Sequence, residues 1–299
     1  PAEGITLDDK LAVTRHLSSS GANIEQLNAV RKQLSRIKGG GLARACRAGR
    51  LLTLIISDVL GDPLDVIASG PTVPDTSTPQ MALDVLREFC ARRAGIDARV
   101  FDYLEQKGRQ PQAQPACHVT NLLIGSNATA VDAARAAAER LGYRPAMAAA
   151  AESEGLAEDV GRDLAHWALW TRSERGPNCL VSGGEPVVRL IEPERRGRGG
   201  RNQQLVLAAL QTLRAAGGAE RIALLSGGTD GEDGPTDAAG AVLDAGLLAA
   251  AEAHRLDPAD YLRRNDAYRF FEPLGGLIVT GPTHTNVCDL RVVVVDQDG

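Results

Sequence analysis

Short runs of apolar residues, each ending in glycine, serine or aspartate, alternate with helical patterns along the chain. Such continuous runs are typical of parallel strands that are buried on both faces of a sheet. The predicted strands cover residues 51–57, 121–125, 179–184 and 221–228. Predicted helices follow at residues 127–142, 202–218 and 245–256, the first with Asn127 as its cap and Gly142 as its stop. The pattern predicts an α/β protein.

The length of 299 residues predicts two domains, because single domains usually hold roughly 100 to 200 residues. The polar segment TRSERGPN, residues 171–178, indicates a linker, so we place the domains at residues 1–175 and 176–299. The Gln- and Pro-rich stretch at residues 107–117 indicates a surface loop.

Composition narrows the class of protein. The net charge of −5 argues against a nucleic-acid partner. The apolar runs are far shorter than a membrane span, and the first residues do not resemble a secretory leader, so we expect a cytoplasmic protein without a membrane partner. The five cysteines are scattered and never in CxxC spacing, so we expect them to fill the core rather than to form disulfides or a zinc site.

An acidic loop follows the last strand of this series. Residues 226–241, SGGTDGEDGPTDAAGA, place Asp230, Asp233 and Asp237 among glycines. Clustered carboxylates repel one another unless a cation or hydrogen-bond donors lie between them. We therefore predict that this loop holds a ligand or a cation.

An N-terminal helix, NIEQLNAVRKQLSRIKGGG, carries a second candidate site. Asn28, Arg31, Ser35 and Lys38 are spaced three, four and three residues apart, which predicts one polar stripe beside the apolar face. Two cations in that stripe suit a phosphate or a carboxylate. The alternative is an ordinary solvated flank of an amphipathic helix.

An arginine loop, residues 185–200, leads into the helix that begins near Arg201. It contains Arg195, Arg196 and Arg198 among glycines, and this arrangement favours an anionic ligand. Nucleic acid is the rival interpretation, but aromatic residues for base stacking are absent nearby. A plain surface loop is the other alternative.

A threonine loop, residues 279–288, follows a further predicted strand with the sequence VTGPTHTNVC. Its hydroxyl and amide groups are suitable phosphate donors, and the next residue, Asp289, either holds a cation or caps a turn. The long loop at residues 57–78 starts with Asp58 at the end of a strand, and loops of this length are usually functional.

The sequence contains neither GxxxxGK[ST] nor GxGxxG, so the usual P-loop and dinucleotide fingerprints have no support. Acidic, basic and hydroxyl-rich loops together suit phosphoryl transfer, in which the protein mainly positions the reactants and neutralises charge around Mg²⁺.

Five motifs in one order carry a family resemblance: NAVRKQLSRIKGG, SDVLGDPLDVIASGPTVPD, GRGGRNQQ, TDGEDGPTDAAGA and GPTHTNVCDL. Together they resemble the glycerate 2-kinase family, the type II glycerate kinases with a C-terminal MOFRL domain, which are also labelled hydroxypyruvate reductases. The resemblance implies ATP-dependent phosphorylation of D-glycerate to 2-phosphoglycerate with Mg²⁺. It also implies a Rossmann-like N-terminal domain, a smaller α/β C-terminal domain, and a cleft between them.

The resemblance implies roles for individual residues. Arg201 and Lys38 are the expected catalytic cations, and Asp230, Asp233 and Asp237 are the expected metal ligands. The expected substrate and phosphate contacts are Arg31, Ser35, Asn202, Thr283, Thr285 and Asn286. The expected nucleotide contacts are Gly199, Gly200, Gly227, Gly228 and Thr229.

The chain also departs from the family pattern. Family members carry a further N-terminal segment with a GKA lysine and an SGGGSA loop, and this chain starts where that loop would end. We therefore expect an incomplete N-terminal sheet that exposes apolar surface. Gln204, His284, Leu60 and Cys288 replace the usual Glu, Gly, Pro and Asn.

Two other functions are kept as alternatives. One is an NAD(P)H-dependent hydroxypyruvate reductase, and the other is a non-catalytic protein that binds glycerate or a nucleotide. The sequence does not fix the oligomeric state, and a homodimer is kept beside a monomer.

Overall fold

The computed structural model describes residues 1–108 and 116–297 and is a mixed α/β protein with two sheets. Contacts divide it into two compact units, here unit 1 (Pro1–Ile55 and Asp62–Ile124) and unit 2 (Ile56–Gly61 and Gly125–Gly299). Residues from Gly125 onward belong to unit 2, because the helix at residues 127–140 and the strand at residues 145–149 pack against the C-terminal part of the chain. The compact units therefore divide elsewhere than at the predicted boundary near residue 175, and unit 2 is the larger.

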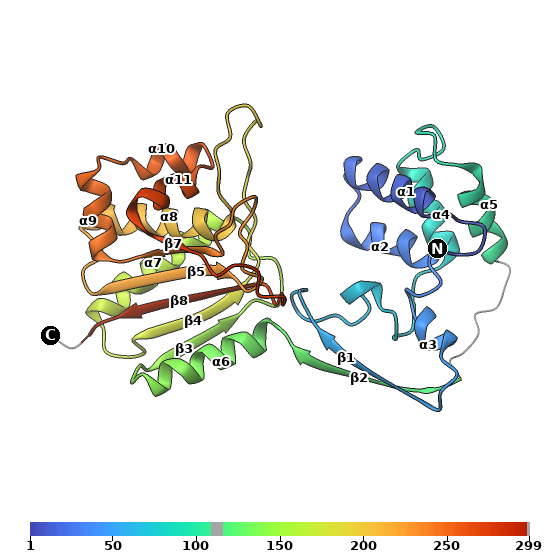
Figure 1. Ribbon diagram of the computed structural model, residues 1–299, viewed down its shortest axis with the longest axis horizontal. Coiled ribbons are helices and arrows are strands. Elements are labelled where there is room, and N and C mark those ends of the chain that lie inside the picture. Colours follow the sequence, from blue (N-terminus) through green and yellow to red (C-terminus); the bar gives the residue numbers. More distant parts are fainter. Residues whose placement is uncertain (109–115, 298–299) are drawn as a thin grey trace. The chain divides into compact units, whose positions relative to one another are not determined.

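Unit 1 is built mainly of helices (Figure 1). In chain order it contains α1 (Leu7–Ser19), α2 (Ile24–Gln33), α3 (Gly41–Ala45), β1 (Arg50–Ile56), the 3₁₀ turn η1 (Ile67–Ser69), α4 (Pro79–Glu88), α5 (Ala98–Lys107) and β2 (His118–Gly125). Helices α1, α2, α4 and α5 share one core that includes Leu17, Val30, Leu86 and Leu104. The segment at residues 109–115, part of the predicted surface loop, lies outside the described residues.

Strands β1 and β2 form a sheet of their own. The Gly49 carbonyl accepts from the His118 N–H, and the Ser57 N–H donates to the Gly125 carbonyl, so the two strands run parallel. The predicted strands are confirmed, but their predicted burial is wrong: Leu52 is 60% exposed. Each strand has one partner strand among the described residues, and apolar side chains such as Leu52 lie uncovered, in agreement with the expected exposure of apolar surface in this sheet.

Unit 2 contains a six-stranded sheet in the order β3-β4-β8-β5-β6-β7. The strands are β3 (Pro145–Ala149), β4 (Cys179–Gly184), β5 (Ile222–Gly228), β6 (Gly240–Leu243), β7 (Leu277–Ile278) and β8 (Asp289–Val295). β3 and β4 are parallel, whereas β8 runs antiparallel to both of its neighbours, β4 and β5. The expectation of an all-parallel sheet is therefore wrong, but β4 and β5 still point the same way and end at the same edge.

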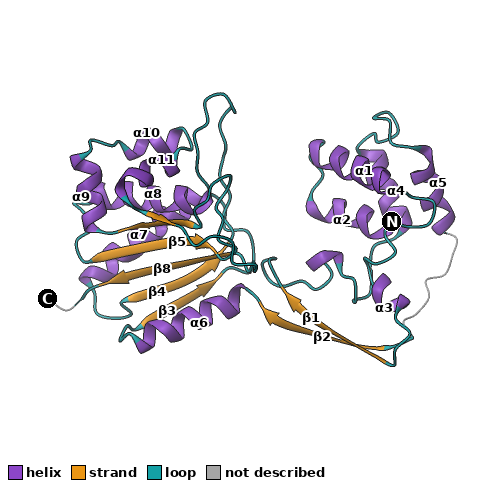
Figure 2. Ribbon diagram, viewed as in Figure 1, coloured by secondary structure: helices purple, strands orange, loops and turns teal. Residues whose placement is uncertain are grey.

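The helices of unit 2 cover both faces of this sheet (Figure 2). They are α6 (Asn127–Arg140), α7 (Ala157–Ser173), α8 (Arg201–Ala215), α9 (Ala245–Ala253), α10 (Pro258–Arg263), α11 (Ala267–Phe271) and the 3₁₀ turn η2 (Glu272–Leu274). α6 packs on one face, and α7 and α8 pack on the other. Ser126, one residue before the predicted Asn127, is the cap of α6, because its side chain accepts the Thr129 N–H.

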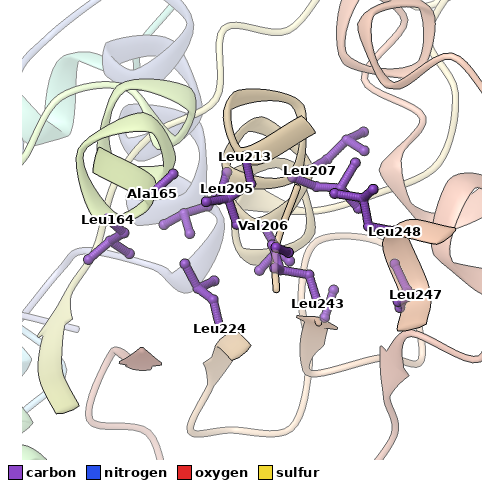
Figure 3. Packing of buried hydrophobic residues seen from close by; sticks show 14 of the residues in the cluster. Leu164, Ala165, Leu205, Val206, Leu207, Leu213, Leu224, Leu243, Leu247 and Leu248 are labelled. Atoms are coloured by element: carbon purple, nitrogen blue, oxygen red, sulfur yellow. The ribbon is translucent and has the colours of Figure 1, made fainter. Parts of the chain in front are cut away.

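The main core of unit 2 lies between α7, α8 and the sheet. Leu205, Val206 and Leu213 of α8 lie over Leu224 and Leu243 of the strands (Figure 3). Burying large apolar side chains in this way is worth about 1.5–3 kcal/mol for each one. This core fixes the start of α8 relative to the edge of the sheet.

All five cysteines are free. Cys179 and Cys288 are buried, as expected of core residues, whereas Cys90 is exposed. No helix among the described residues has the length and apolar character that a membrane crossing requires.

Candidate functional site

Three strands meet at one edge of the six-stranded sheet, where Gly184, Asp289 and Gly228 lie side by side in register. β4 and β5 end there, and β8 starts there. The arginine loop, the acidic loop and the threonine loop therefore all reach this edge. The sequence placed these loops at strand ends, and the antiparallel β8 brings the third loop to the same place as the other two.

Two threonines join the acidic loop to the threonine loop. The hydroxyl of Thr229 donates to the carbonyl of Cys288 at 2.7 Å. The N–H of Thr283 donates to the carbonyl of Asp230 at 3.0 Å, and its hydroxyl donates to the carbonyl of Thr229 at 2.5 Å. The sequence-predicted hydroxyls of Thr229 and Thr283 therefore brace the two loops against each other.

Arg201, the first residue of α8, lies at this edge between two acids. Its Nε donates to Oδ2 of Asp289 at 2.7 Å, and its Nη2 donates to Oδ1 at 3.0 Å. Its Nη1 lies 3.0 Å from Oε1 of Glu185. A two-pronged pair of this kind fixes the plane of the guanidinium. The Asp289 side chain is fully buried, while the Arg201 side chain stays one-third exposed.

The guanidinium of Arg201 stays protonated. Burial opposes the charge, but the hydrogen bonds and charges of Asp289 and Glu185 outweigh it and raise the pKa of Arg201 above its ordinary value. Two of its five N–H groups donate to Asp289, and its Nη1 also pairs with Glu185. A partly exposed cation with a fixed orientation and further N–H groups is suited to an anion.

Cys288 stands next to this pair but is not a nucleophile. Its Sγ donates to the carbonyl of Asp58 at 3.2 Å. Burial, with the charges of Glu185 and Asp289, raises the pKa of the Cys288 thiol to about 12. The thiol is therefore neutral at ordinary pH, and thiolate chemistry has no basis here.

Asp233 caps α8 from across the site. Its carboxylate accepts the backbone N–H groups of Asn202 at 3.0 Å and of Gln203 at 2.9 Å. The Asn202 and Gln203 amides are therefore not free for an anion, because Asp233 takes them. Gly200 makes room for this cap: a Cβ there would lie 2.3 Å from the Asp233 side chain.

The Asp233 side chain is itself only 2% exposed. Burial raises its pKa to about 6, against the opposing effect of the Gln203 and Asn202 amides, and the nearby charge of Asp289 adds to the rise. A carboxylate placed in this way stabilises the helix start rather than offering its oxygens to a solvated ion.

The other two predicted metal ligands, Asp237 and Asp230, have hydrogen-bond partners different from those of Asp233. Oδ1 of Asp237 accepts from Nη2 of Arg198 at 3.0 Å and from the hydroxyl of Tyr268 at 2.9 Å. Oδ1 of Asp230 accepts the Glu232 N–H at 3.1 Å. Within residues 1–108 and 116–297, no three His, Cys, Asp or Glu side chains are arranged to hold a metal ion. The three aspartates therefore do not assemble into one centre in this structure.

Asn202 and Gln204 are buried supports. Oδ1 of Asn202 accepts the Ser226 hydroxyl at 2.5 Å, and its Nδ2 donates to Asp233. Nε2 of Gln204 donates to Glu158 at 2.8 Å and to the carbonyl of Leu262 at 3.0 Å. Asn202 was predicted to bind phosphate, but its side chain is 1% exposed and serves this internal network.

A second buried ion pair lies on the same face of β8 as Asp289. Nη1 and Nη2 of Arg291 donate to the two carboxylate oxygens of Glu154, at 2.8 and 2.6 Å. Gly184 faces this pair, and a Cβ at Gly184 would lie 1.8 Å from Glu154. Alternating strand geometry thus places two charged side chains, Asp289 and Arg291, beneath the helices.

In the threonine loop, Asn286 uses its Oδ1 to accept the Cys288 N–H at 3.0 Å. Thr285 is exposed. Gly227 and Gly228 lie at the end of β5, and Gly199 adjoins the start of α11, where a Cβ would lie 3.2 Å from the Ala267 nitrogen. All of these sequence-predicted residues belong to unit 2.

Lys38 forms a separate polar cluster in unit 1. Its Nζ donates to the carbonyl of Ala68 at 2.9 Å and lies 3.1 Å from the hydroxyl of Ser69. That hydroxyl donates to Oδ1 of the buried Asn28 at 3.1 Å. Ala68 and Ser69 both have positive φ, at 51° and 61°, so Lys38 and Asn28 hold a strained turn.

The predicted stripe on the N-terminal helix is partly wrong. α2 ends at Gln33, so Ser35 and Lys38 lie beyond the helix, and the Ser35 hydroxyl accepts the N–H groups of Ile37 and Lys38. Arg31 remains near Lys38. Burial, together with the charges of Arg31 and Lys10, lowers the pKa of Lys38. Two cations in one neighbourhood leave positive charge that suits an anion.

The sequence did not single out Glu185 and Asp289 as the partners of Arg201. The available signal was the strand pattern of residues 289–295, in which Asp289 and Arg291 share a face with Val293 and Val295. Charges on a buried strand face are rarely retained without a partner. The partner itself comes from a helix 88 residues away in the chain, and spacing alone does not reveal it.

An oriented arginine between acids, beside glycine-rich loops at the end of a sheet, is suited to an anionic ligand such as a phosphate. Comparisons with known proteins agree. Residues 1–105 match the model "Domain of unknown function (DUF4147)", and residues 178–289 match the model of the MOFRL family. Glycerate kinase from Macaca fascicularis is 39% identical over 98% of this chain and 84% of its own length. D-glycerate 2-kinase from Thermotoga maritima is 38% identical over 99% of this chain and 68% of its own length.

A solved structure gives the same picture. The crystal structure of glycerate kinase from Thermotoga maritima matches with a TM-score of 0.85 at 37% identity, and the match covers 99% of this chain and 69% of that one. The chain belongs to the glycerate kinase family. It spans between 63% and 84% of the length of the curated relatives that it matches.

Proposed function

We propose that this protein is a D-glycerate 2-kinase, which transfers the γ-phosphoryl group of ATP to the 2-hydroxyl of D-glycerate. In that reaction the bond from the γ-phosphorus to ADP breaks, a bond to the 2-oxygen forms, and the hydroxyl proton is released. Phosphoryl transfer depends mainly on positioning and on neutralising charge. The observation that carries the proposal is Arg201, whose guanidinium is held by Asp289 through two hydrogen bonds while its side chain stays one-third exposed.

Arg201 would donate to the phosphoryl oxygens as charge develops on them. Lys38 and Arg31 of unit 1 would attract the carboxylate of glycerate or a phosphate, because the charges of Arg31 and Lys10 both act on Lys38. Thr285 would supply a further hydroxyl, since its side chain is exposed in the threonine loop. The parallel pair β1 and β2 also supports the proposal that unit 1 has Rossmann-like character.

Mg²⁺ fits this chemistry in a limited way. Mg²⁺ usually keeps several waters and binds through substrate phosphates with only one or two protein carboxylates. Asp230 fits best, because only its Oδ1 is engaged among the described residues and its side chain is partly exposed. Asp237 and Asp233 fit less well, because hydrogen bonds already engage them. When bound, Mg²⁺ would supply charge neutralisation for the nucleotide phosphates.

The test is an assay of the full chain with ATP, Mg²⁺ and D-glycerate, read by ADP release. The kinase predicts ADP release that depends on D-glycerate. Oxidation of NADH or NADPH by hydroxypyruvate without ADP release would instead support the reductase alternative. Calorimetry that shows binding of glycerate or ATP without turnover would support the non-catalytic alternative. Sedimentation of the same sample separates a homodimer from a monomer.

A further inference from the structure

A glutamate stands directly after β4, at the edge of the sheet where the three loops meet. Glu185 follows Gly184, which is paired in register with Asp289. Figure 1 shows β4 ending and β8 starting on this side of the sheet. The side chain of Glu185 is 42% exposed, and its Oε1 lies 3.0 Å from Nη1 of Arg201. Glu185 is thus an accessible carboxylate beside the arginine that the proposed reaction uses.

The backbone holds Glu185 in place from both sides. On one side, Gly184 belongs to the ladder between β4 and β8. On the other side, the Val187 N–H donates to the carbonyl of Gly155 at 2.9 Å. The residue between, Pro186, is buried, and a proline restricts the residue before it to extended conformations. The carboxylate is therefore presented from a fixed point of the chain.

Three carboxylates act on the charge of Arg201, those of Asp289, Glu185 and Asp233. Asp289 is fully buried and gives both oxygens to Arg201. Asp233 is buried as well and gives both oxygens to amides at the start of α8. Glu185 differs because it is exposed and, within the described residues, no hydrogen bond reaches its Oε2. Of the three, it is the one with an oxygen available to a substrate.

Transfer of a phosphoryl group to an alcohol needs a place for the hydroxyl proton. In protein kinases a carboxylate accepts this proton from the acceptor hydroxyl. A positioned general base typically contributes a factor of about 10² to 10⁴ to the rate. A phosphoryl oxygen bound to Arg201 and the carboxylate of Glu185 would be neighbours, because both contact the same guanidinium. The hydroxyl that attacks the phosphoryl group would therefore lie near Oε2.

We propose that Glu185 is the general base of the reaction and that its Oε2 accepts the proton of the attacking hydroxyl. As that O–H bond breaks, the hydroxyl oxygen forms its bond to the γ-phosphorus. The bond from the γ-phosphorus to ADP breaks, and its electron pair leaves with ADP. Because Glu185 is exposed, it then returns the proton to water. This inference rests on the proposed kinase function and adds the residue that takes the proton.

Two variants separate a base from a residue that only orients Arg201. Glu185→Gln keeps a side-chain oxygen that can accept from Nη1 of Arg201, but it does not take up a proton. We expect it to lower kcat by about a hundredfold or more. Glu185→Ala should lose as much, and added sodium formate, a small carboxylate, should raise its kcat by about tenfold or more, whereas sodium chloride at the same concentration should not.

Glu139→Gln is the matched control. Glu139 is likewise an exposed glutamate of unit 2 that pairs with an arginine, since its Oε1 lies 2.6 Å from Nη1 of Arg135 on α6. We expect its kcat to equal that of the parent chain. The readout is ADP release by the full chain at saturating ATP, Mg²⁺ and D-glycerate. Equal melting temperatures show that the variants are folded.

The outcomes separate this inference from the proposed function. If the parent chain phosphorylates glycerate and Glu185→Gln keeps kcat within about threefold of it, the kinase stands and the base is overturned. Failure of formate to restore Glu185→Ala also overturns the base. So does full recovery of Glu185→Gln at a higher Mg²⁺ concentration, which would make Glu185 a metal ligand. A parent chain that releases no ADP with glycerate contradicts the proposed function itself, and the base with it.

Discussion

The guanidinium of Arg201 donates two hydrogen bonds, at 2.7 and 3.0 Å, to the buried carboxylate of Asp289. Asp289 starts β8, and Arg201 starts α8. The pair therefore joins the helix that carries the cation to the strand on which the three loops converge. The Asp289 carboxylate is fully buried, whereas the Arg201 side chain stays one-third exposed, so removing Arg201 would leave a buried acid without this partner.

Replacing Arg201 tests its role in the reaction. We expect Arg201→Ala to lower kcat by about a hundredfold or more, because it removes a donor to the developing charge. Arg214→Ala, which removes an exposed arginine paired with Glu252 later in the same helix, should leave kcat near the parent value. Steady-state kinetics on both variants provide the measurement. A kcat within about threefold of the parent in Arg201→Ala would show that this arginine is not catalytic.

Replacing Lys38 tests the cluster in unit 1. We expect Lys38→Ala to raise KM for glycerate by about tenfold or more, because the carboxylate loses a cation. The matched control is Arg36→Ala, because Arg36 is exposed two residues earlier. Chemical denaturation should accompany the kinetics, since Lys38 also holds the Ala68 turn. Equal KM values for the two variants would remove Lys38 from the substrate site.

The raised pKa of Asp233 predicts an unusual pH dependence of the protein's stability. Its pKa is about 6 in the folded protein and ordinarily 3.8, so between these values the folded state binds more protons than the unfolded state. Its contribution to the free energy of unfolding therefore falls as pH rises from about 4 to about 6 and is level above that range. We expect a loss on the order of 1–3 kcal/mol across the range.

Asp233→Asn keeps an oxygen for the helix cap and removes the titration. Urea denaturation of the parent and the variant, from pH 4 to pH 7, gives the difference in their free energies of unfolding. The parent should lose stability relative to the variant as pH rises. A difference that is constant with pH would contradict the assigned pKa.

Gly161 tests the packing of α7 on α8. A Cβ at this position would lie 2.2 Å from the backbone oxygen of Leu205, so the helices would have to separate. We expect Gly161→Ala to lower the free energy of unfolding by about 1–3 kcal/mol. Gly176→Ala is the control, because a Cβ there would meet nothing within 4 Å and the φ of Gly176 is not positive. Thermal melting of the two variants should differ clearly, and equal melting temperatures would contradict the tight crossing.

Much of the architecture follows from local pattern. The strands ending at Gly184 and Gly228, and the stop of α6 near Gly142, are predictable because apolar runs and glycine breaks are local signals. The antiparallel direction of β8 is not predictable in that way, because a strand's direction depends on which neighbours it pairs with. The sequence did not reveal that α2 ends at Gln33, because the spacing of polar residues continues past that residue. The glycines from Gly39 onward indicate a turn only later in the chain.

The candidate site was only partly accessible from the sequence. The basic residues and glycines before a helix predicted an anionic ligand near Arg201, and the family resemblance implied its catalytic role. Asp233 was recognised as an important acid, but its bonds to the start of α8 come from a loop some 30 residues later in the chain. The partners of Arg201 depend on the same kind of long-range contact. The spacing of residues predicts which side chains are neighbours on one helix or strand, but it does not predict which side chains of two different elements are in contact.

The most direct test of the central claim is the product formed by the full chain from ATP, Mg²⁺ and D-glycerate, followed by phosphorus NMR. We expect one new phosphate monoester signal, that of 2-phosphoglycerate, appearing in step with ADP and strongly reduced in Arg201→Ala. A product phosphorylated at the 3-position, or 2-phosphoglycerate formed equally well by Arg201→Ala, would contradict the claim.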